Sequence, residues 1–139
     1  MQISVNSARK EIEIIRDGQN VGSVFFSPAD TAILSRLKEV QVKAQKIGAE
    51  IPEDADTEQA LEIAKRVDKE LREALDWAFD YPCSDVVFGN SFAFTTSNGV
   101  TMLEQFLDGA MKYISAELSS ETKAAQKRQE KYLAKYQKK

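Results

Sequence analysis

The sequence predicts a mainly α-helical domain of the α+β class, with a β-hairpin at residues 10–26 ahead of the helices. Two observations support this. Charged residues alternate with isoleucine over residues 10–16, which is the spacing of a strand with one buried face. Beyond residue 27, apolar residues recur at spacings of four and three, which is the pattern of helices that bury one side. A chain of 139 residues is long enough for one such domain.

The predicted hairpin joins two β-prone runs, at residues 10–16 and 21–26, through Asp17-Gly18-Gln19-Asn20. Gly18 can adopt the positive φ that a tight turn requires. Because an isolated hairpin is only marginally stable in water, we expect it to pack on the helices or to pair with another chain.

Two amphipathic helices of similar length follow. Ser27-Pro28 is typical of a helix start and Gly48 of a helix end. After an acidic segment at residues 49–56, Asp56 is expected to cap a second helix that extends to about Asp80. Their narrow apolar seams predict an antiparallel helical hairpin. The seam residues are Ile33, Leu37, Val40, Ala44 and Ile47, then Ala60, Ala64, Val67, Leu71, Ala74 and Ala78, with Leu61, Leu75 and Phe79 beside them.

The remainder of the chain has a core part and a basic part. After a break at Tyr81-Pro82-Cys83, the pattern predicts a short helical turn ended by Gly89, an irregular segment at residues 90–99 and a third core helix to about Leu118. Residues 1–118 thus form the predicted domain, with net charge −8. Residues 119–139 carry net charge +5 and little apolar surface, which predicts a helical tail that docks weakly outside the core.

The composition excludes several kinds of chemistry. The chain has no histidine, so it contains no Ser-His or Cys-His nucleophile pair and no histidine metal ligand. Its one cysteine, Cys83, cannot form an internal disulfide, and a structural role is favoured because no basic residue stands nearby to activate the thiol. The acidic residues 50–56 lack the pattern of a calcium-binding loop. We therefore expect no catalytic residue, no metal and no cofactor.

Aromatic residues gather in one short region. Six of the twelve lie within residues 77–94, which are irregular in pattern, and protein interfaces are rich in aromatic side chains. The alternative is that they all cover the end of the helical hairpin. The candidate partner-binding residues are Trp77, Phe79, Tyr81, Phe88, Phe92 and Phe94.

The basic tail is a second candidate site. Lys127, Arg128, Lys131 and Lys135 could bind nucleic-acid phosphates, an acidic partner or the acidic part of the chain itself. The net charge of −3 and the lack of a base-reading motif argue against nucleic acid.

No targeting or membrane segment is expected. The first ten residues lack the apolar stretch of a signal peptide. No run approaches the ~20 apolar residues that span a bilayer. We therefore expect a cytoplasmic protein that does not bind membranes.

The order of these features resembles a family of small phage proteins. Phe26-Ser27-Pro28-Ala29-Asp30 follows the hairpin, and Asp85-Val86-Val87-Phe88-Gly89-Asn90-Ser91-Phe92 precedes the last apolar helix. Over residues 10–118 this order is similar to that of tail assembly chaperones of long-tailed bacteriophages of Gram-positive hosts. The resemblance implies a non-enzymatic protein of the host cytoplasm that keeps the tape-measure protein soluble while the tail tube assembles. A homo-oligomer is also expected, since a hairpin edge or an exposed seam can pair with a second copy.

Overall fold

We describe residues 1–6, 9–48 and 56–137 in a computed structural model of the chain. Two antiparallel strands, β1 (Lys10–Arg16) and β2 (Gln19–Phe26), form the N-terminal hairpin. The predicted mainly helical α+β fold is confirmed. The helices and a second, short hairpin are α1 (Ile33–Gly48), α2 (Thr57–Phe79), α3 (Ser84–Phe88), β3 (Thr96–Ser97), β4 (Val100–Thr101) and α4 (Met102–Gln137).

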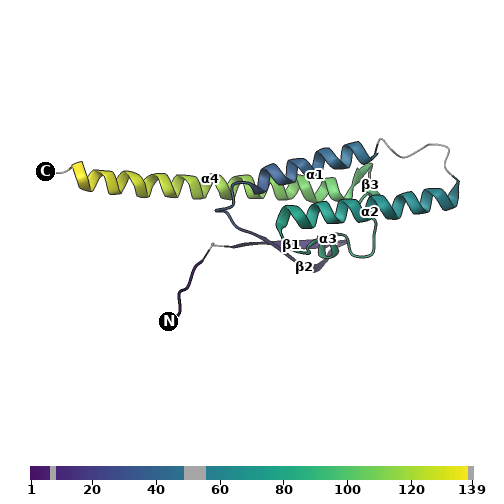
Figure 1. Cartoon of the computed structure of the whole chain (residues 1–139), viewed down its shortest axis with the longest axis horizontal. Coiled ribbons are helices and arrows are strands. Elements are labelled where there is room, and N and C mark those ends of the chain that lie inside the picture. Colours follow the sequence, from purple (N-terminus) through teal and green to yellow (C-terminus); the bar gives the residue numbers. More distant parts are fainter. Residues whose placement is uncertain (7–8, 49–55, 138–139) are drawn as a thin grey trace.

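The three long helices form one layer, and the N-terminal hairpin lies against it together with α3 (Figure 1). α1 and α2 run antiparallel, as predicted, and α4 packs beside α1. The side chains between these elements form one core, and each large one contributes about 1.5–3 kcal/mol by leaving water. The largest fully buried residues include Phe88, Ile33, Leu37, Leu75, Leu103 and Ile114.

The turn of the N-terminal hairpin is tighter than the sequence predicts. Asp17 and Gly18 have positive φ angles of 52° and 81°, as in a two-residue type I′ turn. β2 therefore begins at Gln19, two residues earlier than expected. The hairpin contacts the core through Ile12, Ile14, Val24 and Phe26.

The start of α1 also differs from the prediction. The Ser27 hydroxyl accepts a hydrogen bond from the N–H of Ala29 at 3.3 Å, within a local turn. It does not cap a helix at Pro28, and α1 begins at Ile33 instead.

Both ends of α2 are where the sequence places them. The Asp56 side chain accepts a hydrogen bond from the N–H of Gln59 at 2.8 Å, and Asp80 ends the helix in a left-handed conformation. However, the first turns of α2 extend beyond the end of α1 (Figure 1). Ala60 and Leu61, which the sequence places in or beside the seam, are therefore exposed.

α4 is one continuous helix of 36 residues. The predicted third core helix and the predicted basic tail are thus two parts of a single element. Burial changes within it: Leu118 is half-buried, whereas every described side chain of residues 119–134 is exposed. We call residues 119–137 the α4 extension. Figure 1 shows it leaving the rest of the molecule along the long axis.

The hairpin of β3 and β4 is a feature that the sequence pattern did not predict. Asn98 and Gly99 form its turn, with φ angles of 53° and 80°. Asn-Gly is a strong hairpin signal, but each strand has only two residues, which is too short for an alternating pattern to show.

Candidate interaction surface

The six aromatic residues predicted to bind a partner do not form one surface. Phe79 and Phe88 are exposed by only 7% and 0%. Both are core residues: Phe88 belongs to α3, which packs against α2 and the hairpin, and the ring centroid of Phe79 lies 5.8 Å from that of Phe106. Their choice as candidate partner-binding residues was therefore wrong, and the alternative that they cover the helical hairpin holds for these two. The Tyr81 hydroxyl oxygen accepts a hydrogen bond from the backbone N–H of Phe25 in β2. Burial raises the pKa of the Tyr81 phenol above 10.0, although this hydrogen bond lowers it in part.

Trp77 is the most exposed residue of the six, with 52% of its surface accessible. It borders a hollow of about 340 Å³ between α1 and α2, which Val40, Ala74, Glu39, Lys43 and Glu73 complete. We call this hollow the Trp77 hollow. Tryptophan is enriched among the residues that dominate binding energies. An indole that is half exposed beside two packed helices is a candidate anchor for a partner.

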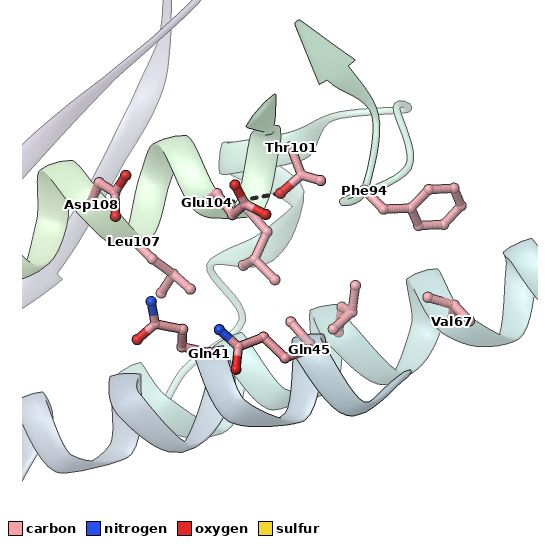
Figure 2. A pocket seen from close by; sticks show the side chains of 11 residues that line it. Gln41, Gln45, Val67, Phe94, Thr101, Glu104, Leu107 and Asp108 are labelled. Atoms are coloured by element: carbon pink, nitrogen blue, oxygen red, sulfur yellow. Dashed lines mark hydrogen bonds between the residues drawn. The ribbon is translucent and has the colours of Figure 1, made fainter. Parts of the chain in front are cut away.

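Phe92 and Phe94 are half-buried and stack on each other, with ring centroids 5.1 Å apart and planes 15° apart. Phe94 also borders a larger hollow, of about 520 Å³, between α1, α2 and α4. We call this hollow the three-helix groove (Figure 2). Its floor is formed by Val67, Leu71, Leu103 and Leu107, and its rim includes Gln41, Gln45, Glu104 and Asp108.

A row of charged residues on α2 holds the segment that follows it. Asp68, Arg72 and Asp76 are spaced four residues apart, so they share one side of the helix. The Arg72 Nε donates to Asp68 Oδ2 at 2.9 Å. Its Nη2 donates to the carbonyls of Gly89 and Ser91, both at 2.7 Å. One guanidinium thereby fixes two points of the irregular chain on α2.

The two ends of α3 are held in the same way. Asp76 accepts hydrogen bonds from the N–H groups of Cys83 and Ser84, at 2.9 and 2.7 Å. At the other end, Arg16 of β1 donates to the carbonyl of Val86 at 3.0 Å. Sequence reasoning missed this cluster, although the regular spacing of the three charged residues on α2 was an available signal.

Cys83 is a structural residue. It is fully buried, and its Sγ lies 3.9 Å from the carbonyl oxygen of Leu75. Burial, followed by the nearby negative charge of Asp76, raises the pKa of the Cys83 thiol to about 12. The thiol is therefore protonated at neutral pH, which is the opposite of activation.

The acidic segment considered as a metal site falls largely outside the described residues, which resume at Asp56. Within the described ranges, no group of three or more acidic, histidine or cysteine side chains is placed to hold a metal ion.

The basic residues form a separate surface on the α4 extension. Lys127, Arg128 and Lys131 are exposed there. Lys135 belongs to the same helix, but its side chain is outside the described set. The extension and the short hairpin that borders the three-helix groove lie toward opposite ends of the molecule (Figure 1).

In comparisons with protein-family models, curated proteins and solved structures, the chain matches none. The resemblance to phage tail assembly chaperones therefore stays a prediction from short motifs. Among the helices as described, none combines the length and the apolarity needed to cross a membrane.

Proposed function

We propose that the protein is a non-enzymatic interaction protein of the phage tail assembly chaperone type, acting in the host cytoplasm. Its client is an apolar or helical protein such as the tape-measure protein. The observation that carries this proposal is Trp77, which is half exposed beside a hollow on a helical hairpin. The order of features in the sequence supports the choice of client.

The Trp77 hollow suits a helical client for two reasons. Ala74 is small, so a client side chain can approach the two helices closely, and Glu39 and Lys43 offer polar contacts at the edge. The surface is also held in shape, because the Arg36 Nε of α1 donates to the carbonyl of Ala78 in α2 at 2.8 Å. A rigid surface loses little conformational entropy on binding.

Co-expression with a tape-measure protein tests the proposal. The unchanged protein should keep the client soluble in a complex that survives purification. Trp77→Ala should weaken that complex by about tenfold or more, as expected for a hot-spot residue. Leu61→Ala is the matched control, since Leu61 is a large apolar residue of α2 with 49% exposure, and it should have little effect. A client that stays insoluble and unbound with the unchanged protein would show the proposal to be wrong.

A second candidate is a nucleic-acid-associated or adaptor protein that acts through the α4 extension. The exposure of Lys127, Arg128 and Lys131 on one helix favours it. Contacts to phosphates would make binding strongly salt-dependent. Replacing these residues and Lys135 with glutamine should abolish binding to DNA or RNA. If the unchanged protein binds neither at low salt, this candidate is eliminated.

A further inference from the structure

We propose that the α4 extension of one copy docks into the three-helix groove of a second copy, so that copies associate head to tail. This interaction is independent of the client proposed above and uses a different surface from the Trp77 hollow.

The groove has an apolar floor and a negatively charged edge. Figure 2 shows Glu104 and Asp108 on the same side of the opening, and Phe94 at the other end. Both carboxylates belong to exposed residues, and no ion pair within the described ranges involves either of them. An apolar hollow of about 520 Å³ beside two free negative charges suits a basic amphipathic segment.

The α4 extension is such a segment. Ala125 and Tyr132 are seven residues apart, and Leu133 is next to Tyr132, so all three share one side of the helix. Tyr132 and Leu133 are 60% and 56% exposed. Arg128 precedes Tyr132 by four residues and lies at the edge of this side, whereas Lys131 lies toward the far side of the helix and adds to the net positive charge of the extension.

The extension of a copy cannot reach that copy's own groove. Leu107 lines the groove, and Tyr132 follows it by 25 residues in the same continuous helix. At 1.5 Å per residue the two lie about 38 Å apart. The extension would reach its own groove only if α4 broke and folded back. The extension can therefore occupy only the groove of another copy.

Charge also favours this contact between two copies. Residues 119–139 carry a net charge of +5 and residues 1–118 a net charge of −8, so opposite charges meet when the extension of one copy approaches the groove of another. Two extensions side by side would repel each other. A nucleic acid would neutralise the lysines of the extension but would not cover the apolar floor of the groove. Because the contact joins two different surfaces, further copies can add to form a ring or an open chain.

Charge reversal on each surface provides the test. One variant combines Glu104→Lys with Asp108→Lys, and the other combines Arg128→Glu with Lys131→Glu. Light scattering and sedimentation at physiological ionic strength should show concentration-dependent association of the unchanged protein. The association constant should fall at least about tenfold in each variant. A mixture of the two variants should associate again, and so should a chain that carries all four substitutions.

Lys65→Glu with Lys69→Glu is the matched control, because it changes the net charge as much as the reversal on the extension does. These lysines are exposed on the side of α2 opposite Val67, which lies in the groove floor, so association should be unchanged. Circular dichroism confirms that each variant is folded.

Three outcomes would overturn the inference: a protein that is monomeric at every concentration, association that persists in both reversed variants, or equal weakening by the control. No client is present in these experiments. Their failure would therefore leave the Trp77 proposal standing, and failure of the co-expression test would leave this one standing.

Discussion

The two parts of α4 share a backbone but differ in what stabilises them. Residues 102–118 bury Leu103, Leu107, Ala110 and Ile114 against the rest of the molecule, whereas the described side chains of residues 119–134 are all exposed. The extension is helical because its alanine, lysine and glutamine residues have a high helix propensity and because the buried part of α4 nucleates the helix. Helix formation and burial are thus encoded separately. A helix that is formed but not packed keeps its side chains available for a partner.

The largest effect that separates the two parts comes from removing apolar side chains. Ile114 is fully buried, so Ile114→Ala should lower the free energy of unfolding by about 2–5 kcal/mol. Leu133 is 56% exposed, so Leu133→Ala should change it by less than about 0.5 kcal/mol. Urea unfolding followed by circular dichroism measures both. If the Leu133 variant lost more than about 1 kcal/mol, the extension would have to pack on another surface.

The same comparison shows how far the sequence could predict the fold. The spacing of apolar residues located the buried part of α4 and the seams of α1 and α2, because a helix with one buried side has apolar residues at regular intervals in its sequence. This regular spacing ends at Leu118, and the prediction therefore placed the end of the domain there. The helix nevertheless continues, since propensity maintains it without burial.

The candidate site was harder to predict, because it depends on how segments meet in space. Charged residues on a helix usually face solvent, so nothing local revealed that Asp68, Arg72 and Asp76 bind the chain that follows α2. This cluster orients α3, and that orientation buries Phe88. The aromatic composition alone could not distinguish Phe88 from the exposed Trp77.

Alkaline pH should affect the packed part of the molecule through Cys83. Its pKa is raised from 9.0 to about 12 in the native state, first by burial and then by Asp76. Between these values the thiol is ionised only in the unfolded chain. The free energy of unfolding should therefore be insensitive to this group below about pH 9, and should fall by about 1.4 kcal/mol per pH unit from about pH 9 to about pH 12.

Urea unfolding at several pH values from about 8 to 11 measures this slope. Cys83→Ala should remove it, apart from the contribution that Tyr81 adds above about pH 10, where the raised pKa of its phenol acts with the same sign. Equal slopes in the variant and the unchanged protein would mean that solvent reaches the Cys83 thiol in the native state.

A smaller effect is expected within the packed part of α4 itself, at Gly109, which is exposed. A glycine within a helix can allow another segment to pack closely, or it can simply be a weak point in the helix. Apart from its two chain neighbours and the nearby backbone of α4 itself, no described atom lies within 4 Å of the position that a Cβ would occupy there, so the second interpretation is favoured. Gly109→Ala should then raise the free energy of unfolding by about 1 kcal/mol, by the difference in helix propensity.

Gly89→Ala serves as a control, because the same substitution should change the stability in the opposite direction there. Gly89 has a φ of 58°, and a Cβ there would lie 2.6 Å from the Arg16 Cζ, so the substitution should lower the free energy of unfolding by about 1–3 kcal/mol. Thermal unfolding measures both changes, and the midpoint temperature should rise for Gly109→Ala and fall for Gly89→Ala. Gly109 borders a hollow between β1 and α4. If Gly109→Ala were destabilising, another molecule would have to cover this side of α4. The side of the helix at Gly109 would then count as packed and not as exposed.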